Sequence, residues 1–523
     1  MTDPVRHHAR ARPSAPALVT PDAVWTWAEL DARVGACAAR LAAPPRAPDV
    51  WQGAAPLAVR AQTSPDLVVL TLAALRSGPT LVPLSTRWPA AAVADALDRL
   101  GLDALVADGS DGAPTGLDTT PLDALARAGR GGAEERGGAG EAAQSAVASS
   151  TTSLRATTLR KGGAGEGGAG AGRGGARTPT PEPLDPQTPF TVVHTSGSTG
   201  VPKAALHTVG NHVASARGVN RRLGLGADGR WLLDLPLYHV GGLGVVVRCA
   251  LEGAAMVLPG EGMSTAEAVR VLRPTHASFV STQLRRLLDA LGGAAGGAAS
   301  LRAVLLGGSA IPASLLDEAA ARGLPVATSY GLTEMTSTVT ATAAGAGRPA
   351  LATSGAVLDG RALRLTAGGE IEVGGAALFA GYLGPDGLAP PGAWFATGDL
   401  GHLDDAGRLV VTGRRGLMFV SGGENVQPEA IEAALLALDG VAEAVVVPVP
   451  DADFGHRPAA FVRTTSAAPP DADGLRAALR RTLPGFMVPV AVYAWGGAGG
   501  MKPDRPALAE RAGGMGRNRG AEG

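Results

Sequence analysis

The sequence predicts an α/β protein, with a large N-terminal domain of mainly parallel sheets flanked by helices and a small α+β C-terminal domain. Three observations support this prediction. The chain has 523 residues, more than one hydrophobic core usually organises. Short apolar segments alternate with segments of helical periodicity over most of its length, as in βαβ units. From about residue 413 the pattern changes to that of a separate, smaller unit.

The first elements follow from periodicity and segment length. Residues 24–41 predict a helix, because apolar side chains recur there at three- and four-residue steps. These side chains are Trp27, Leu30, Val34, Cys37 and Leu41. A strand is expected at 56–59, a helix at 65–76 and a short buried strand at 79–84. We assign residues 1–126 to the first part of the large domain.

The composition changes sharply between about residues 127 and 187. Gly, Ala, Ser, Thr and Arg dominate, no aromatic residue occurs, and a Pro-rich run covers 178–183. Such a segment buries too little apolar surface to offset the entropy lost on ordering. We therefore expect a disordered insertion at 127–187 that serves as a spacer.

Strand–helix alternation resumes after the insertion, and residues 188–412 complete the large domain. Over 363–373 the hydrophobic period shortens toward two, and Gly368-Gly369 is typical of a hairpin turn. Core strands are expected at 232–236, 277–280 and 303–306.

The small C-terminal domain is expected at 413–512. Its helix begins at Pro428, because proline suits the first helical position, and Gly440 ends it. The apolar face of this helix consists of Ile431, Leu435 and Leu438. Residues 513–523 are expected to form a disordered, frayed tail.

Composition excludes several classes of function. The net charge of −1 and an aromatic content of 4% predict no nucleic-acid partner. The two cysteines, Cys37 and Cys249, lie in apolar runs and indicate buried thiols in a reducing compartment. The N-terminus has no apolar signal core, and the most apolar helix candidate, 67–75, is too short to span a bilayer. We expect a cytoplasmic protein without a membrane span, and the histidines show no metal-binding spacing.

The segment from residue 195 to 203 is the most informative in the chain. It reads Thr195-Ser196-Gly197-Ser198-Thr199-Gly200-Val201-Pro202-Lys203 and follows an apolar, β-prone run at 190–193. Glycines allow close backbone approach, hydroxyls add donors and the lysine adds a charge, which is the chemistry of a polyphosphate-binding loop. The spacing is not that of a P-loop, since Gly-x-x-x-x-Gly-Lys-Ser/Thr is absent. The alternative interpretation is a flexible Gly/Ser linker.

Further segments complement this loop. Residues 329–334 combine an aromatic face, a hydroxyl and a carboxylate, and 394–399 end in a carboxylate at a turn, suited to two ribose hydroxyls. Gly413-Arg414 opens the small domain, and Lys502 lies in a Gly-rich loop. Taken singly, Asp399 is also compatible with a turn residue and Lys502 with a solvated lysine.

In this order and spacing, the segments resemble the acyl-adenylate-forming superfamily of acyl-CoA synthetases, luciferases and peptide-synthetase adenylation domains. The resemblance runs from Trp25 to Lys502 without the insertion. Further segments are similar to the o-succinylbenzoate–CoA ligases of menaquinone biosynthesis. These segments are 235–242, 277–284, 305–312, 419–428 and 454–458. The Ser-Thr-Gln-Leu stretch at 281–284 and the Gly-Gly-Met-Lys ending at 499–502 favour this branch over fatty-acid ligases.

The resemblance implies ATP, Mg²⁺ and coenzyme A as a co-substrate, and two half-reactions. A carboxylate attacks the α-phosphate of ATP and releases pyrophosphate; the coenzyme A thiolate then attacks the acyl-adenylate and releases AMP. The small domain is expected to rotate between the two steps. The other implied partner is a small-molecule acid, and homo-oligomerisation stays open.

The resemblance also implies residue roles. The catalytic residues are Lys502 on the carboxylate and α-phosphate, Thr333 on the α-phosphate, Glu334 as the Mg²⁺ ligand, and His239. The residues that bind ATP or AMP are Thr195, Ser196, Gly197, Ser198, Thr199, Gly200, Lys203, Gly308, Tyr330, Gly331, Asp399 and Arg414. Tyr330 would lie against adenine, whereas Asp399 and Arg414 would hold ribose. The residues that bind the acid are Arg248, Thr338 and Gly241, and the hinge is Gly416.

Arg248 is the residue that points to the acid. It lies in an otherwise apolar run, 244–250, where an unpaired guanidinium would be costly, so we expect an anion to meet it. The residues alone leave open an internal Asp or Glu partner, and the family pattern favours a dicarboxylic substrate. For Thr338 the alternative is an ordinary strand-end threonine.

The chain departs from the family pattern at two positions. Gly241 stands where a polar residue often follows His-Val, and Gly416 stands where the hinge usually has Asp or Lys. Glycine can absorb a large φ/ψ change, so a hinge at Gly416 remains compatible with the sequence. Two other functions stay open. One is a CoA ligase for another aryl or aliphatic acid, and the other is a stand-alone adenylating protein that loads a carrier, although no carrier domain is expected in this chain.

Overall fold

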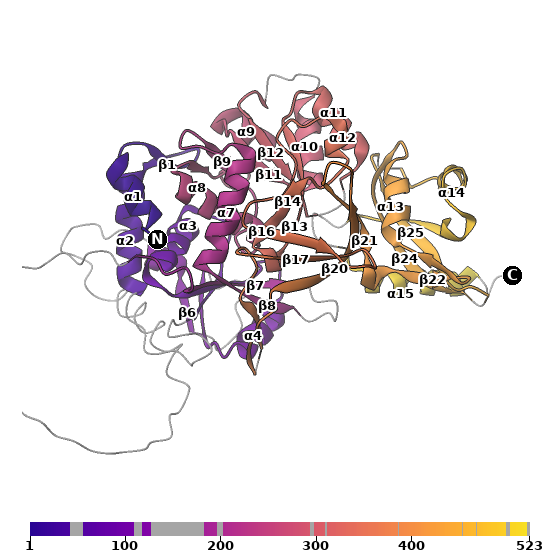
Figure 1. Ribbon diagram of the computed structural model, residues 1–523, viewed down its shortest axis with the longest axis horizontal. Helices are drawn as coiled ribbons and strands as arrows, with labels where there is room; N and C mark the ends of the chain where they lie inside the picture. Colours follow the sequence, from indigo (N-terminus) through magenta and orange to yellow (C-terminus); the bar gives the residue numbers. More distant parts are fainter. Residues whose placement is uncertain are drawn as a thin grey trace, which may run out of the picture.

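The computed structural model describes residues 1–41, 56–108, 118–126, 183–195, 202–292, 298–308, 311–384, 386–451, 453–466, 468–497 and 503–519. A large body contains the N-terminal three quarters of the chain, and a small unit built from the C-terminal residues lies at one end of it (Figure 1). The predicted α/β class and the small C-terminal domain are therefore confirmed.

The first sheet of the large body has nine strands, and its centre is parallel. The six strands β13, β12, β11, β9, β10 and β1 run parallel, whereas β2, β14 and β15 add antiparallel edges. In spatial order the strands are β15 (Ala356–Val357), β14 (Ser337–Ala341), β13 (Val326–Leu332), β12 (Ala303–Leu306), β11 (His276–Phe279), β9 (Arg230–Leu232), β10 (Ala255–Val257), β1 (Pro16–Val19) and β2 (Val24–Thr26).

The second sheet has eight strands and brings distant parts of the chain together. Strands β7, β4, β3, β5 and β6 are parallel, and β8, β18 and β19 extend the sheet in antiparallel fashion. In spatial order they are β19 (Gly387–Ala389), β18 (Gly381–Gly384), β8 (Lys203–Thr208), β7 (Pro189–Thr195), β4 (Thr80–Pro83), β3 (Pro56–Arg60), β5 (Ala104–Ala107) and β6 (Asp118–Pro121).

A third, antiparallel sheet of four strands leads from the large body to the small unit (Figure 1). Its strands are β16 (Arg361–Leu365), β17 (Glu370–Gly375), β20 (Trp394–Leu403) and β21 (Leu409–Arg414). The turn between β16 and β17 contains Gly369 at φ +75°, so the hairpin predicted at Gly368-Gly369 is confirmed.

The main core lies between the two large sheets. It joins buried side chains of both sheets, such as Leu81 and Trp231, to those of the helices between and around them. Those helices are α1 (Pro4–Ala11), α2 (Trp27–Leu41), α3 (Pro65–Ser77), α5 (Leu122–Ala126), α7 (Val209–Leu223) and α8 (Val240–Glu252). The remaining helices of the large body are α4 (Ala90–Arg99), α9 (Thr265–Leu272), α10 (Ser281–Leu291), α11 (Ala313–Ala321) and α12 (Arg348–Leu351).

Helix α3 shows how local sequence sets these elements. The Ser64 side chain accepts a hydrogen bond from the Leu67 amide, and Pro65 occupies the first turn. Gly78 ends the helix in a left-handed conformation at φ +97°. Every residue between Leu67 and Leu75 is buried, which explains the uniformly apolar sequence of this helix.

Two predicted elements differ in the structure. The helix predicted at 24–41 begins only at Trp27, because 24–26 form β2, which pairs with β1. The strand predicted at 232–236 ends at Leu232. Beyond it the Asp234 carboxylate accepts hydrogen bonds from Thr265 at 2.6 Å and Gln283 at 3.2 Å, so the chain leaves the sheet toward α9 and α10.

The small unit has a five-stranded sheet covered by helices. Its strands are β23 (Glu424–Val426), β22 (Phe419–Ser421), β25 (Gly455–Thr464), β24 (Val441–Asp451) and β26 (Ala491–Ala494), and its helices are α13 (Pro428–Leu436), α14 (Ala472–Leu479) and α15 (Arg505–Arg519). Helix α13 begins at Pro428 as predicted but ends at Leu436, and Gly440 at φ +82° lies in the turn that follows.

The C-terminal end is more ordered than the sequence predicts. Residues 513–519, expected in a frayed tail, continue helix α15. The helix docks on β24, where Leu508 and Ala512 are buried beside Val447 and Phe461. The apolar contacts of these two side chains hold a segment whose Gly-rich sequence suggested fraying.

The predicted insertion falls mostly outside the described residues. Its last part, 183–187, is described and belongs to the folded body: the Leu184 amide donates to the Met1 carbonyl at 2.7 Å, and the Met1 ammonium donates to the Leu184 carbonyl at 2.8 Å. Residues 183–187, predicted as part of the insertion, therefore belong with the large domain. None of the helices within the described ranges combines the length and the apolar character that crossing a bilayer requires.

Replacing residues 127–182 with a short Gly/Ser linker is expected to leave the melting temperature and turnover unchanged, because loop-closure entropy changes only logarithmically with loop length. Extending the replacement through 187 is the matched control. It should lower the melting temperature, since it removes the Leu184 contacts with the N-terminus. A loss of stability or turnover with the shorter replacement would show that the insertion contributes to the fold or the site.

Candidate active site

The ends of the predicted phosphate loop are fixed by a hairpin. Thr195 at the end of β7 pairs with Lys203 at the start of β8. The connecting residues Ser196, Gly197, Ser198, Thr199 and Gly200 lie outside the described residues. Thr195 and Lys203 thus lie at one end of the second sheet, where Lys203 is exposed.

A tight turn after β13 carries the predicted catalytic pair. The chain passes from β13 through the short 3₁₀ helix η3 (Thr333–Met335) into β14. Thr336 and Ser337 adopt left-handed φ values of 52° and 98°, a strain that concentrates at functional sites. Gly331 is required beside it, since a Cβ there would lie 2.0 Å from the Ser337 carbonyl oxygen.

Three hydrogen bonds from other elements hold this turn. His207 Nε2 on β8 donates to the Thr333 carbonyl at 2.7 Å, and the Phe379 amide donates to the Glu334 carbonyl at 2.8 Å. The Tyr382 hydroxyl on β18 donates to Glu334 Oε1 at 2.5 Å. Burial lowers the pKa of His207 to about 4, so its ring is neutral at pH 7. Residues of other elements thus position both the backbone of the turn and the Glu334 carboxylate.

Tyr330, Asp399 and Arg414 meet between the first and third sheets. The Tyr330 hydroxyl donates to Asp399 Oδ2 at 2.7 Å, and Arg414 Nη1 lies 3.6 Å from Asp399 Oδ1. Asp399 and Arg414 are direct partners across β20 and β21. Burial and the neighbouring Asp399 carboxylate raise the pKa of Tyr330, so its hydroxyl stays protonated. The structure therefore assembles the three residues predicted to hold adenosine.

Gly308 lies close to the same end of the first sheet. It follows β12 at φ +86°, a left-handed conformation that favours glycine. On the adjacent strand β13, Ser329 Oγ donates to the Leu306 carbonyl at 2.8 Å. The carboxyl ends of β12 and β13, which are parallel, thus bring Gly308 toward Tyr330.

Arg248 is buried, and the described part of the chain offers it no charged partner. It lies on α8, only 1% exposed, with its guanidinium carbon 5.1 Å from the centroid of the Trp231 ring. Within the described residues, its Nε and Nη2 atoms have no hydrogen-bond partner, and no carboxylate pairs with it. Burial and the charge of Arg361 lower the pKa of Arg248 to about 9. The internal Asp or Glu partner that the sequence left open is not found in this part of the chain.

Arg361 differs from Arg248 in its hydrogen bonding. It is also buried, but its nitrogens donate to the carbonyl oxygens of Thr338 at 2.9 Å, Asp359 at 2.8 Å and Ser215 at 2.9 Å. Two guanidinium groups therefore lie in the same interior region; all three nitrogens of Arg361 donate hydrogen bonds, whereas Nε and Nη2 of Arg248 find no acceptor among the described residues. An anion entering this region would find a donor set at Arg248.

The other residues predicted for the acid pocket surround α8. Thr338, 3% exposed, lies on β14, which packs against α8. His239 is the residue before the first turn of α8, with its ring 4.7 Å from that of Tyr238. Gly241 lies in the first turn, where a Cβ would be 3.2 Å from Leu235 Cδ1. A larger side chain at 241 would therefore need Leu235 to move.

The predicted hinge follows the Asp399–Arg414 pair directly. Gly416 lies in η4 (Arg415–Leu417), and a Cβ there would meet nothing within 4 Å. Arg415 Nη1 lies 2.7 Å from Glu370 Oε2 on β17. A cavity of about 270 Å³ opens at this point, lined by Thr366, Gly368, Glu370, Leu400 and Arg415.

Lys502 lies outside the described residues, but the segment that follows it is anchored. Three residues further on, Arg505 forms a two-point ion pair with Glu432, at 2.6 and 3.0 Å, and donates to the Val446 carbonyl at 2.8 Å. The start of α15 is thus tied to α13 and β24 of the small unit.

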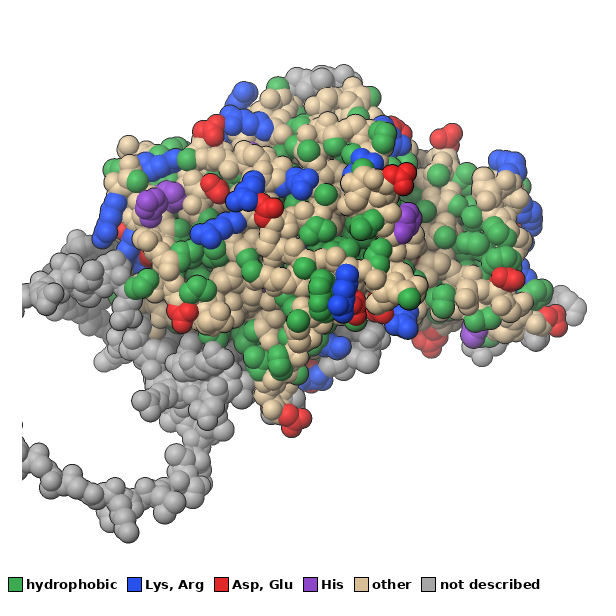
Figure 2. Space-filling view, viewed as in Figure 1, with side chains coloured by type: hydrophobic (Ala, Val, Ile, Leu, Met, Phe, Trp, Pro, Cys, Tyr) green, Lys and Arg blue, Asp and Glu red, His purple; other side chains and the backbone are tan. Residues whose placement is uncertain are grey.

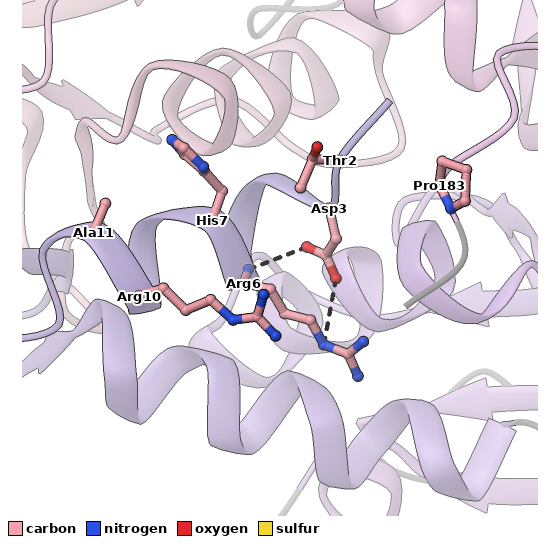
Figure 3. A pocket seen from close by; sticks show the side chains of 7 residues that line it. All are labelled: Thr2, Asp3, Arg6, His7, Arg10, Ala11 and Pro183. Atoms are coloured by element: carbon pink, nitrogen blue, oxygen red, sulfur yellow. Dashed lines mark hydrogen bonds and ion pairs between the residues drawn. The ribbon is translucent and has the colours of Figure 1, made fainter. Parts of the chain in front are cut away.

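A second cavity, of about 380 Å³, lies away from these residues (Figure 3). It is lined by Thr2, Asp3, Arg6, His7, Arg10, Ala11 and Pro183, and Asp3 accepts a hydrogen bond from the Arg6 amide at 3.2 Å. None of the predicted site residues lines it. Acidic and basic side chains are interspersed over the face of the molecule in Figure 2, as expected from the small net charge.

Two contacts of the turn were missed by the sequence analysis. Tyr382 and His207 reach Glu334 and Thr333 from positions 48 and 126 residues away. No local spacing signals such pairs. The alternation of His207 with Ala205 and Lys203 along one strand is the one hint that the histidine shares a face with the lysine.

Comparison with known proteins assigns the family. The model of the AMP-binding enzyme family matches residues 5–383, and that of the AMP-binding enzyme C-terminal domain matches residues 430–496. A 2-succinylbenzoate--CoA ligase of Salmonella typhimurium is 43% identical over 290 residues, 54% of this chain and 60% of that protein. The corresponding ligase of Escherichia coli K12 is 41% identical over 275 residues, 51% of this chain and 57% of that protein. The matched part thus spans about 60% of the length of these relatives.

The fold of this chain agrees with the folds of solved structures over nearly its full length. A variant of E. coli MenE with bound OSB-AMS is 29% identical, with a TM-score of 0.74 over 98% of both chains. The o-succinylbenzoate CoA synthetase (MenE) from Bacillus subtilis, in complex with the acyl-adenylate intermediate OSB-AMP, shares the fold at 24% identity and a TM-score of 0.75. Because the family model covers well over half of the sequence, the chain belongs to the AMP-binding enzyme family.

Proposed function

We propose that this protein is an ATP-dependent acid–CoA ligase that converts o-succinylbenzoate into o-succinylbenzoyl-CoA, with an acyl-adenylate intermediate, in menaquinone biosynthesis. The observation that carries the proposal is Arg248, a buried guanidinium with no anion beside it among the residues that the structure describes. The relatives of this chain are named 2-succinylbenzoate--CoA ligases.

The charge balance favours a dicarboxylic acid. One carboxylate of the substrate must stay free to attack ATP, so the anion that meets Arg248 has to be a second carboxylate. A buried cation without a partner is costly, and a bidentate carboxylate offsets that cost with two charge-assisted hydrogen bonds. Thr338 and Gly241 would line the same pocket, because β14 packs against α8 and a Cβ on Gly244, one turn after Gly241, would lie 3.2 Å from Arg248 Nη2.

The nucleotide would lie across the ends of the two large sheets. Tyr330 would stack on adenine, Asp399 and Arg414 would hold ribose, and Gly308 and Gly331 would allow close backbone approach. The phosphates would meet Thr195, Lys203 and the loop between them, with Thr333 at the α-phosphate. Donors converging on one end of a sheet fit the general placement of ligands in α/β folds.

The Glu334 carboxylate fits Mg²⁺, a hard cation that takes one or two protein carboxylates together with phosphate oxygens and water. Among the described residues no group of three or more His, Cys, Asp or Glu side chains surrounds a common point, which excludes an all-protein metal cage there. A bound Mg²⁺ would neutralise charge on the triphosphate. Among the described residues, Glu334 would be the protein's contribution.

The chemistry proceeds in two balanced steps. A carboxylate oxygen of the acid attacks the α-phosphorus and displaces pyrophosphate, with Lys502 stabilising the charge that develops on the α-phosphate. The coenzyme A thiolate then attacks the acyl carbonyl, and AMP leaves. His239, the residue that precedes α8, would border the reacting carboxylate. Gly416 would be the hinge about which the small domain turns between the two steps. A cytoplasmic location, where ATP and coenzyme A are available, goes with this activity.

The test is formation of the CoA thioester with o-succinylbenzoate, benzoate and medium-chain acids, each at matched concentration with ATP and Mg²⁺. We expect o-succinylbenzoate to give by far the highest kcat/KM. Preference for another acid would move the assignment to a different CoA ligase. ATP–pyrophosphate exchange without any thioester would instead indicate an enzyme that loads a carrier.

A further inference from the structure

The Tyr382 side chain connects two residues of the predicted nucleotide site that lie far apart in sequence. Its hydroxyl donates to Glu334 Oε1 at 2.5 Å, and the Lys203 ammonium lies 5.0 Å from the centroid of its ring. Tyr382 lies on β18, which pairs with β8, the strand that begins at Lys203. The same ring therefore contacts a cation through its π system and a carboxylate through its hydroxyl.

The ring is held in place by its neighbours. Phe379 lies edge-on to Tyr382 at a centroid distance of 4.8 Å, and Phe395 on β20 lies at 6.4 Å. The Phe379 amide also donates to the Glu334 carbonyl, so the segment around Tyr382 contacts the backbone and the side chain of the same residue. The direction of the hydroxyl is thus set by packing and not by Glu334 alone.

Lys203 and Glu334 form no ion pair with each other, and within the described residues Lys203 has no carboxylate partner. The Lys203 ammonium lies over the face of the Tyr382 ring, whereas the Glu334 carboxylate accepts a hydrogen bond from the hydroxyl of the same ring, so Tyr382 contacts each charge through a different part of its side chain. A direct pair would satisfy both groups and would compete with the triphosphate for Lys203 and with the cation for Glu334.

We propose that Tyr382 is a positioning residue for the nucleotide site: it orients the Glu334 carboxylate toward Mg²⁺ through its hydroxyl, and its ring contacts Lys203, which stays available for the phosphates of ATP. The proposal rests on the proposed function in one respect, that this site binds ATP with Mg²⁺. It adds Tyr382 to the residues of the nucleotide site, through its contacts with both Glu334 and Lys203.

The decisive variant is Tyr382→Phe, which keeps the ring, its aromatic contacts and the position of Lys203 and removes only the hydroxyl. The Mg²⁺ concentration that supports half-maximal binding of ATP, measured by calorimetry without acid or coenzyme A, should rise about tenfold, as is typical when the partner of a metal ligand is removed. The matched control is Tyr493→Phe on β26 in the small unit, whose ring packs on Phe461. It should bind ATP as the wild type does.

A double-mutant cycle separates positioning from general damage. In a Glu334→Gln background, Tyr382→Phe should produce no further change in the Mg²⁺ requirement, because the two residues act as one unit. In each background, the protein with Tyr382→Phe and the protein without it should have the same melting temperature. An unchanged or lower Mg²⁺ requirement in Tyr382→Phe, or equal losses with and without Glu334, would overturn the inference. If the wild type binds ATP with Mg²⁺ but makes no o-succinylbenzoyl-CoA, the proposed function fails while this test still stands.

Discussion

Lys502→Ala is expected to slow formation of the acyl-adenylate strongly while sparing the second half-reaction. The adenylation rate should fall by about 10²–10³, the usual effect of removing one preorganised group that stabilises charge in the transition state. The variant should still convert supplied acyl-adenylate and coenzyme A into thioester at a rate close to that of the wild type.

The different effects expected on adenylation and on thioester formation follow from where negative charge accumulates in the transition state. The α-phosphorus undergoes substitution in the first step only, so a lysine that stabilises the charged transition state at this phosphorus contributes to that step. The two-point Arg505–Glu432 ion pair ties the segment after Lys502 to the body of the small unit. We therefore expect the lysine to move with this unit, so that a rotation about Gly416 would remove it before coenzyme A reacts.

The measurement is a pair of assays on one preparation. ATP–pyrophosphate exchange with o-succinylbenzoate reports the first step, and thioester formation from the isolated acyl-adenylate reports the second. Lys161→Ala, a lysine of the predicted insertion, is the matched control and should leave both rates unchanged. Equal losses in both assays, or no loss in either, would show that Lys502 is not the adenylation lysine.

Much of the fold was predictable because the sequence signals that mark its helices, strands and turns are local. Strand β12 matches the predicted 303–306, and α3 differs from the predicted 65–76 by one residue, since an N-cap serine, a proline and a terminal glycine mark its ends. The hairpin at Gly368-Gly369 follows from the same kind of signal. Where tertiary contacts decide, prediction was wrong: β2 exists because β1 lies beside it, and residues 513–519 are helical because Leu508 and Ala512 dock on β24.

The residues of the candidate site also fall into two groups, those identified from local sequence motifs and those whose contacts arise only in the folded chain. Motif residues such as Tyr330, Asp399 and Arg414 were identified from their segments, and the structure brings them together. The partners that orient the site were not identified. Tyr382 and His207 act on Glu334 and Thr333 across strands that adjoin only in the folded chain, so their roles depend on the register of β18 and β8.

Arg248→Ala is expected to weaken the use of o-succinylbenzoate far more than the use of benzoate, which lacks the second carboxylate. The loss of a hydrogen-bonded charge pair is worth about 1.5–3 kcal/mol, so kcat/KM for o-succinylbenzoate should fall roughly ten- to hundredfold relative to benzoate. Arg248→Lys should rescue poorly, because the ammonium lacks the planar fork that binds a carboxylate bidentately.

The same position allows a test that does not depend on activity. The buried Arg248 guanidinium has no anionic partner among the described residues, so replacing it by the similarly shaped, uncharged Met removes an uncompensated charge. Arg248→Met is therefore expected to raise the melting temperature of the ligand-free protein. Arg361→Met is the matched control and should lower it, because the carbonyls of Thr338, Asp359 and Ser215 would lose their donors.

These outcomes distinguish a substrate-binding arginine from a structural one. A structural ion pair predicts that Arg248→Met lowers the melting temperature as Arg361→Met does, and that o-succinylbenzoate and benzoate lose activity equally. A substrate-binding arginine predicts opposite signs for the two melting-temperature changes and a selective loss with the dicarboxylic acid. Parallel measurement of the four variants by thermal unfolding and by thioester formation decides between the two, since a buried charge kept at a cost to stability is expected only where a ligand compensates it.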